Sequence, residues 1–476
     1  MQSRELPYGF LFGLLTLAVA AAVFLHQPLL MLTAPVAVLL LHLTGAPRAL
    51  LLFLWFSIPW SMEVQLTPSL GTDFPDEPLM WLTTLVIVVM MFQSPQRMAE
   101  LISHPIMIWI ALLWCWACIS TMATSGGWLS VKYLLAKLWF IVPFTCGSYL
   151  LLDGADTRRK AFTLIAIPMI ILAVVTLFRH ALTGFSFAEV SNVCAPYFRN
   201  HVNYGALLVC TLPMIWILHR VTRNPWWIVG LVILLIALYF SYSRGAWLAL
   251  PVGVLAVWFM RKRLLVYVMV FVVLVVTAVS IWLIQDNQYL RYRPDYSSTI
   301  YHAALGDHIE ATYAMKDLST AERFYRWIAG WRMAEAHPLT GVGPNHFYPA
   351  YRSYTVAAYR TYVSSNPERS TVHNYFLLLL SEQGFPALIL FVVLLFTMFA
   401  YAQNAYHRST NTEDRFLLQA LTAMLAMVVI LISLSDLIEA DKIGSLFYII
   451  AGLLIGMTSG AHIQRVSQSI AEQVKG

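Results

Sequence analysis

The chain has 476 residues, of which 59% are hydrophobic, 14% are aromatic and only 11% are charged. Soluble globular proteins carry about 25% charged residues, so this composition excludes a cytosolic enzyme, a disordered chain and a disulfide-stapled secreted fold. The apolar runs are continuous, whereas the strands of a membrane barrel alternate apolar and polar residues. Only helices and closed barrels satisfy their backbone hydrogen bonds in lipid. The sequence therefore predicts an all-α polytopic integral membrane protein.

The net charge of +6 and the five cysteines do not indicate a nucleic-acid-binding protein or a metal or redox protein. Cys115 and Cys118 have the spacing of a metal or redox pair, but they lie within an apolar run without a second ligand pair, so we interpret them as packing residues. The basic residues are spread over many short loops, which is typical of membrane topology and argues against a nucleic-acid partner. The sequence contains no phosphate loop, His-Glu-x-x-His helix or Asp-x-Asp pair, so we expect no metal and no cofactor.

Apolar windows of about 17 to 22 residues recur along the chain and predict fourteen spans, with twelve as the lower count. The predicted spans are 10–25, 29–45, 49–62, 78–93, 105–123, 133–152, 161–178, 202–219, 225–243, 246–260, 264–284, 374–403, 415–435 and 444–461. The first contains Ala18-Val19-Ala20, which resembles a signal-peptidase site, but a second span follows directly, so we expect an uncleaved first helix.

The apolar windows and one long polar segment divide the chain into three parts. We predict a transmembrane helix bundle over 1–284, one large periplasmic helical loop over 285–373, and closing transmembrane helices with a cytoplasmic tail over 374–476. The loop is the part of the chain with room for a subdomain outside the membrane. Chemistry is therefore expected in or beside it.

The short loops carry unequal numbers of cations. With a cytoplasmic N-terminus, the short cytoplasmic loops hold Arg4, Arg48, Arg97, Arg158, Arg159, Lys160, Arg220, Arg223, Arg261, Lys262, Arg263, Arg408, Arg415, Arg465 and Lys475. The opposite short loops hold only Lys132, Arg179, Arg199, Arg244 and Lys442. This asymmetry follows the positive-inside rule and puts the long loop outside the cytoplasm.

The long loop contains a pattern typical of an amphipathic helix. Ser319 and Glu322 have capping-box spacing, and the aromatic residues that follow recur at helical intervals until Pro338. The pattern predicts a helix over 320–336. Its aromatic face either covers a site as a lid or packs the loop onto the helix bundle, and the sequence leaves both interpretations open.

A glycine-containing turn follows this helix, from His337 to Pro344. Gly341 and Gly343 resemble part of a dinucleotide fingerprint, but they follow a helix where the fingerprint follows a strand, so we interpret them as turn residues that need glycine conformations. A second helix, with a weaker pattern, is predicted over about 346–360.

Several cations lie at the predicted outer membrane surface. They are Arg199, Arg244, Arg323, Arg326, Lys132 and Lys137. Each alone is typical of an anchor to lipid headgroups. Together they favour an anionic ligand, because guanidinium groups bind phosphate oxygens bidentately and offset the charge of a pyrophosphate. Lys137 would lie about 7 Å deeper than Lys132 and roughly 140° around the helix, so the two lysines need not share a face.

His373 and Asn374 open the span that follows the loop. A single histidine at a helix start is commonly a cap or a packing residue, but imidazole is also the usual general base near neutral pH, and the neighbouring cations favour catalysis. Glu382, about half a turn away and some 13 Å further along the helix, is interpreted as a buried residue that pairs with another helix. Gly384 and Pro386 predict close packing and a bend.

The order of these motifs resembles the signature of the O-antigen ligase/polymerase superfamily. The residues that carry the resemblance are Glu322-Arg323, Trp327, the run from His337 to Phe347 (HPLTGVGPNHF), and His373-Asn374 followed by nine residues and Gly384. The resemblance is specific over 322–387 and looser over 199–203 and 243–245. In that family the pattern His-Asn, nine residues, Gly-x-x-Gly/Thr is associated with ligases and protein O-oligosaccharyltransferases more than with polymerases. This chain departs from it at Ala387.

The resemblance implies transfer of a glycan from undecaprenyl pyrophosphate at the outer face of the bacterial inner membrane, without nucleotide, metal or other cofactor. It implies His373 as the base that activates the acceptor hydroxyl, with Arg199, Arg244 and Arg323 stabilising the pyrophosphate leaving group. Secondary candidates are Lys132, Lys137, Asn374, Arg326 and His337. The main hypothesis is an inverting O-antigen ligase whose partners are the lipid-linked donor, lipid A-core as acceptor, and membrane lipids. It requires the arginines to converge on His373.

Three alternatives stay open. An O-antigen polymerase or a protein O-oligosaccharyltransferase would use the same donor, and no residue reports the acceptor. A lipid-glycan transporter or flippase would line a path with the cations and form no bond, although transport would not require the loop motifs and no inverted repeat is visible in the sequence. A structural scaffold would leave the outward cations unexplained.

Overall fold

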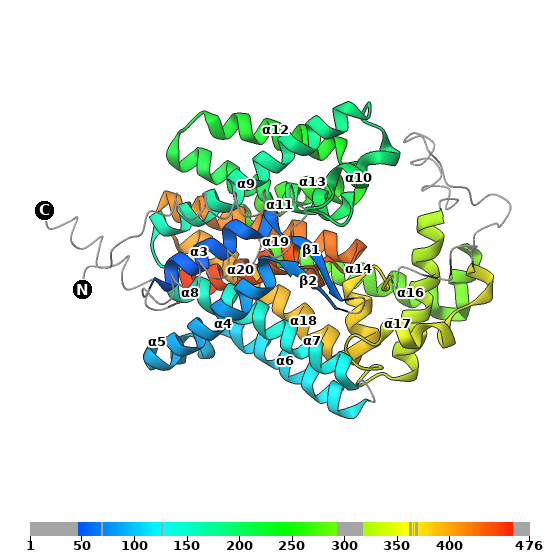
Figure 1. Cartoon of the computed structure of the whole chain (residues 1–476). Coiled ribbons are helices and arrows are strands. Elements are labelled where there is room, and N and C mark those ends of the chain that lie inside the picture. The colour runs from blue at the N-terminus through cyan, green and yellow to red at the C-terminus, as the bar shows by residue number, and fades with distance from the viewer. Residues whose placement is uncertain are drawn as a thin grey trace, which may run out of the picture.

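The computed structural model describes residues 46–67, 70–124, 127–292, 318–360, 364, 366 and 370–459. The described residues are mostly helical, and they contain one antiparallel hairpin of strands β1 (Met62–Thr67) and β2 (Leu70–Phe74). Nine of the described helical segments are long and apolar enough to cross a membrane. The prediction of an all-α polytopic membrane protein is confirmed (Figure 1).

A described helix overlaps each predicted span from 49–62 onward, but the helices at the predicted spans 49–62, 225–243 and 246–260 are not among the nine segments that are long and apolar enough to cross a membrane. The N-terminal helices are α3 (Pro47–Ser57), α4 (Asp76–Gln93), α5 (Pro95–Ser103), α6 (Pro105–Ala123), α7 (Gly127–Phe140), which continues through the π-helical segment η3 (Ile141–Cys146) into α8 (Gly147–Leu151), α9 (Ala155–Leu182), α10 (Val190–Cys194), α11 (His201–Thr222), α12 (Trp226–Phe240), α13 (Arg244–Arg261) and α14 (Leu265–Ile284). The later helices are α16 (Leu318–Ala336), α17 (Phe347–Ala350), α18 (Tyr375–Arg408), α19 (Thr412–Leu434) and α20 (Asp441–Thr458). The predicted spans 10–25 and 29–45, with the expected uncleaved first helix, lie outside the described residues.

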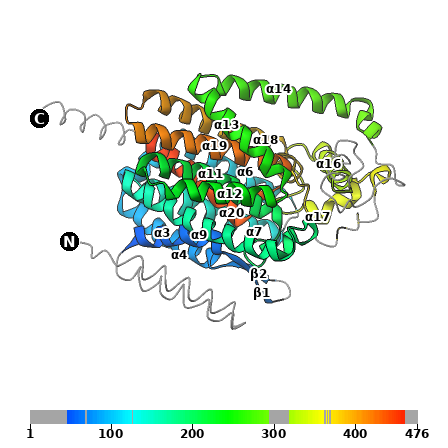
Figure 2. The same ribbon diagram turned by 90° about the horizontal axis from the view of Figure 1, so that it is seen from above.

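Helices α19 and α20 form the centre of the bundle, and most of the residues in their apolar stretches are buried. Helix α13 approaches α19 closely because it has a glycine at the contact: a Cβ atom on Gly253 would lie 2.4 Å from the side chain of Met427. Small residues at such contacts allow close packing between helices in lipid, where burying apolar surface gives little advantage. Helix α14 lies along the outside of the bundle with its apolar stretch exposed (Figure 2).

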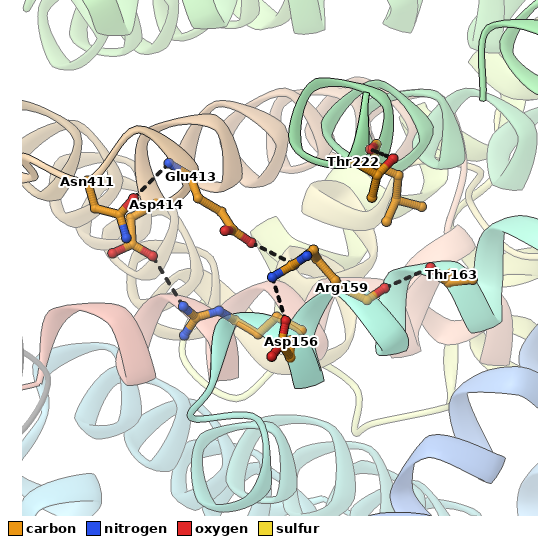
Figure 3. Close-up of polar contacts among 9 residues, drawn as sticks. Asp156, Arg159, Thr163, Thr222, Asn411, Glu413 and Asp414 are labelled. Atoms are coloured by element: carbon orange, nitrogen blue, oxygen red, sulfur yellow. Dashed lines mark hydrogen bonds and ion pairs between the residues drawn. The ribbon is translucent and has the colours of Figure 1, made fainter. Parts of the chain in front are cut away.

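Charged residues tie the helices together at one end of the bundle. Arg158 at the start of α9 binds Asp414 at the start of α19 at 3.2 Å, and both side chains are buried. Arg159 lies between Asp156 of its own helix and Glu413 of α19 (Figure 3). These arginines belong to the set that the charge asymmetry assigns to the cytoplasmic loops. The cations that the asymmetry assigns to the opposite side are described below.

The predicted amphipathic helix 320–336 is present as α16, which lies beyond the ends of the long helices (Figure 1). Its aromatic face packs on α18, where Trp331 and Phe385 make an edge-to-face contact with ring centroids 6.3 Å apart. A Cβ atom on Gly330 would lie 3.2 Å from the side chains of Val372 and Leu377. This contact fits both interpretations of the helix, because a lid that rests on the spans packs on the bundle as well.

The predicted second helix over 346–360 is wrong. The chain forms only α17 and two short 3₁₀ segments, η6 (Tyr351–Tyr354) and η7 (Ala357–Tyr359). Thr355 and Val356 between them adopt extended backbone angles, as β-branched residues commonly do. Burial of Tyr351 and Tyr359 in the core outweighs the helical pattern.

The turn after α16 docks into a break in α18. Gly384 interrupts that helix with φ of +77°, which would leave backbone groups unpaired inside the bundle. Three hydrogen bonds satisfy them: Val342 N to Ser381 O (3.1 Å), Gly343 N to Glu382 O (2.9 Å) and Phe385 N to Pro338 O (2.8 Å). Broken helices are tolerated in membrane proteins where neighbouring segments satisfy the freed groups. The glycines of the turn are confirmed as turn residues, with φ of +64° at Gly341 and +107° at Gly343.

We predict that Gly384→Ala destabilises the protein by more than about 2 kcal/mol, because a Cβ there would lie 2.1 Å from Leu339 O on a left-handed backbone. Gly456→Ala in α20 is the matched control, because the nearest atoms to its Cβ position are 4.0 Å away. Thermal unfolding of the purified proteins in detergent measures both. Equal midpoints for the two variants would contradict the close approach at the break.

Candidate functional site

His373 lies just before α18 with a left-handed backbone, φ +53°. Asn374 is the N-cap of the helix, and its Oδ1 accepts a hydrogen bond from Leu377 N at 3.0 Å. The His-Asn pair therefore has a local explanation: Asn374 fixes the start of α18, and the left-handed residue before it turns the imidazole out of the helix. A third of the His373 side chain is exposed.

Asp436 faces His373 from the segment between α19 and α20. Its Oδ1 lies 4.0 Å from His373 Nδ1, which is too long for a hydrogen bond and leaves an interaction between charges. Its Oδ2 accepts a hydrogen bond of 2.6 Å from the hydroxyl of Thr371. Thr371 precedes the histidine by two residues, so the carboxylate holds the loop that carries His373 and favours a proton on Nδ1. Nε2 is then the nitrogen left to accept a proton.

The pKa of His373 is lowered from its ordinary value of 6.5 to about 4. Burial is the largest cause, because it disfavours the charged imidazolium. Asp436 raises the pKa, while the positive charges of Arg326 and Arg323 lower it. The imidazole is therefore neutral at neutral pH, which is the form that a general base requires. The same interactions show that Arg323 and Arg326 of α16 lie within electrostatic range of His373.

Arg326 is the more buried of these two arginines. Its Nη2 lies 3.3 Å from Glu322, one helical turn earlier, and Glu322 also accepts a hydrogen bond from Ser364 at 2.5 Å. The Nε of Arg326 is buried and has no hydrogen-bond partner among the described residues. Buried donors are normally paired, so this open donor next to a neutral histidine is a candidate contact for an anionic ligand.

Arg199 reaches the same region from the segment before α11. Its Nη2 and Nε bind Oε2 of Glu63 in strand β1 at 2.7 and 3.0 Å, and 70% of its side chain is exposed. It also interacts electrostatically with Asp436. The ring of the preceding residue, Phe198, lies 4.9 Å from the ammonium group of Lys442. The segments around Arg199 and His373 therefore meet at the connection between α19 and α20.

Arg244 opens α13 at this end of the bundle. A Cβ atom on the next residue, Gly245, would lie 3.3 Å from Leu434, the last residue of α19. The start of α13 therefore lies beside the end of α19. Leu434, the last residue of α19, precedes Asp436 by two residues.

The remaining secondary candidates, Lys132, Lys137 and His337, have other partners than His373. Lys137 binds Glu439 at 2.8 Å, with 8% of the lysine side chain exposed, and Lys132 interacts electrostatically with Glu77 at the start of α4. The two lysines therefore have different partners, in agreement with their different helix faces. His337 is exposed at the end of α16 and lies 3.2 Å from the hydroxyl of Tyr354, so its described contact is with the loop and not with His373.

The connection 435–442 was missed as part of the site by the sequence reasoning. It supplies Asp436 to His373 and Glu439 to Lys137, and Lys442 donates to the backbone carbonyls of Ile58, Pro59 and Ser61. Four charged residues in eight positions between two apolar spans were the available signal. Among the residues that the structure describes, no three His, Cys, Asp or Glu side chains converge as metal ligands.

The fold and these contacts define a multi-pass membrane protein with a histidine, a carboxylate and several arginines gathered at one end. Residues 229–392, from α12 into α18, match the family model described as O-antigen ligase. This match, which covers about a third of the chain, supports membership of the O-antigen ligase superfamily. No curated protein matches it with significance. The matched segment includes His373, Arg323 and Arg326, whereas Arg199 and the connection 435–442 lie outside it.

We predict that Lys137→Met and Glu439→Gln each destabilise the protein by about 2–4 kcal/mol, because each leaves a mostly buried charge or polar group without its partner. The double variant should lose less than the sum of the two, since both charges are then gone. Chemical unfolding in detergent measures all three. Strictly additive losses would show that the two side chains do not interact.

Proposed function

We propose that the protein is an O-antigen ligase that moves a glycan from undecaprenyl pyrophosphate to a hydroxyl of lipid A-core, at the periplasmic face of the bacterial inner membrane. The observation that carries this proposal is that His373 lies 4.0 Å from Asp436 and within electrostatic range of Arg323 and Arg326. A base next to cations suits a reaction in which a hydroxyl loses a proton while a diphosphate departs. Membership of the superfamily supports a lipid-linked glycan as the substrate class.

In the proposed reaction the acceptor hydroxyl attacks the anomeric carbon of the donor. The oxygen–carbon bond forms as the bond from that carbon to the pyrophosphate oxygen breaks, and the hydroxyl proton passes to Nε2 of His373. The diphosphate leaves with the bonding electrons, and Arg326, Arg323 and Arg199 stabilise its added negative charge. A single direct displacement inverts the configuration at the anomeric carbon and needs neither a metal nor a covalent glycosyl-enzyme.

Donor binding would also prepare the base. Arg326 and Arg323 lower the pKa of His373 in the free protein, and a bound pyrophosphate offsets their charge. The pKa of His373 then rises toward its ordinary value, which makes the imidazole a stronger base only when the donor is present. Coupling of this kind would limit proton abstraction in the absence of substrate.

We predict that the purified protein glycosylates lipid A-core from undecaprenyl-pyrophosphate glycan in the presence of a chelator, and that His373→Ala abolishes the product. His337→Ala, which alters an exposed histidine in contact with Tyr354, is the control and should retain activity. The products are resolved on a gel. Longer glycans that remain on undecaprenyl pyrophosphate would indicate a polymerase, and a glycosylated protein acceptor would indicate an oligosaccharyltransferase. Absence of any covalent product would favour a transporter.

We predict different acid limbs for the two pH profiles of this reaction. The profile of kcat/KM for the donor reports the free protein and should lose activity only as the pH falls toward about 4, where His373 becomes protonated. The profile of kcat reports the donor complex and should lose activity at a higher pH, because the pKa of His373 is raised there. Coincident acid limbs would contradict the coupling between the arginines and the base.

A further inference from the structure

The carboxylate of Glu382 is buried inside the bundle and binds the backbone of the docked turn. Its Oε2 accepts a hydrogen bond from Asn345 N at 2.8 Å, and its Oε1 accepts one from Phe347 N at 2.8 Å. The side chain is 4% exposed. Glu382 is buried as expected, and its partners are two backbone amides: that of Asn345 in the turn and that of Phe347, the first residue of α17. Backbone amides that donate to a carboxylate are among the stronger hydrogen bonds in proteins.

The same turn is held from a second side by helices α6 and α7. Ser120 donates to Thr340 O at 2.6 Å, and Ser130 donates to Pro344 O at 2.7 Å. Trp116 donates from its indole to Gln383 O at 2.8 Å, directly before the break in α18. The turn is thus fixed between α6, α7 and the two halves of α18, with the Glu382 carboxylate at its centre.

The backbone of the turn packs directly against the backbone of α18 at two glycines. A Cβ atom on Gly341 would lie 2.2 Å from the backbone carbon of Glu382, and one on Gly384 would lie 2.1 Å from Leu339 O. The turn follows α16, and His373 lies directly before Asn374, the N-cap of α18. The position of α16 relative to α18 therefore determines how far Arg323 and Arg326 lie from the imidazole.

We propose that Glu382 is a positioning residue for glycosyl transfer: its carboxylate locks the turn 338–347 into the break of α18 and so holds Arg323 and Arg326 of α16 in register with His373. The proposal rests on the proposed function above and adds a residue that never touches the substrate. In this proposal Gly341, Gly343 and Gly384 allow the backbones to approach closely enough for the turn to reach the Glu382 carboxylate.

The test uses Glu382→Gln in the full-length protein. A carboxamide has one oxygen where the carboxylate has two, so one of the amides of Asn345 and Phe347 loses its acceptor and faces an NH₂ group. Glu335→Gln is the matched control, because Glu335 is exposed on the same helix α16 and lies outside the turn. Ser120→Ala removes a different contact of the same turn and should give a smaller effect in the same direction.

Two measurements are made on these proteins. Hydrogen–deuterium exchange of peptides covering 338–347 reports the lock without any substrate, and it should be faster in Glu382→Gln than in the parent or in Glu335→Gln. Transfer kinetics should show kcat lowered by tenfold or more, as a displacement of the reacting groups by about 1 Å can cost a hundredfold. The acid limb of kcat/KM should also move to higher pH, because Arg323 and Arg326 no longer lower the pKa of His373 to the same extent.

Faster exchange together with a lowered kcat and a shifted acid limb supports the proposal. Unchanged exchange in Glu382→Gln overturns the lock, and faster exchange with an unchanged kcat and acid limb overturns the positioning role. If the parent protein itself transfers no glycan, the proposed function fails and the positioning role fails with it. That outcome is distinguishable, because exchange and transfer are measured separately on the parent protein.

Discussion

The break in α18 is the constraint on which the rest of this end of the molecule depends. A helix inside a membrane bundle can be interrupted only if its freed backbone groups find partners, and here the turn 338–347 supplies them. Docking of that turn fixes α16 on the bundle, brings two arginines near His373, and requires glycines where the backbones cross. The position of the proposed catalytic groups therefore depends on the backbone hydrogen bonds between the broken helix and the turn 338–347, which lies about forty residues earlier in the sequence.

The connection 435–442 is the second organising element. It joins α19 and α20, whose apolar stretches are mostly buried, and its charged side chains bind groups from several distant segments. Asp436 interacts with both His373 and Arg199, so one carboxylate links the proposed base to a proposed donor contact. At the opposite end of the same bundle, the ion pairs of Arg158 and Arg159 join α9 to α19. Two charged ends separated by apolar helices are what a chain that spans a membrane repeatedly requires.

Much of the fold was predictable because hydropathy and helical periodicity are local signals. The spans and the helix α16 were predicted to within a few residues, while the helix over 346–360 failed because tyrosine burial and β-branched residues override a weak pattern there. The candidate site was predictable only in part. His373 and Arg323 carry sequence motifs, but Asp436 is an ordinary acidic residue in a short loop, and its position opposite His373 depends on how α19 packs. The sequence did not identify the atoms that bind Glu382 for a similar reason, since backbone amides carry no residue-specific signal in a sequence.

The most direct test of this account is an experimental structure of the full-length protein in lipid nanodiscs with bound undecaprenyl pyrophosphate. The account predicts that the diphosphate lies against Nε of Arg326, with Arg199 released from Glu63 to meet it and with His373 facing the carbon that would carry the glycan. A diphosphate bound away from His373, with the Arg199–Glu63 pair intact and Arg326 in contact only with Glu322, would contradict it.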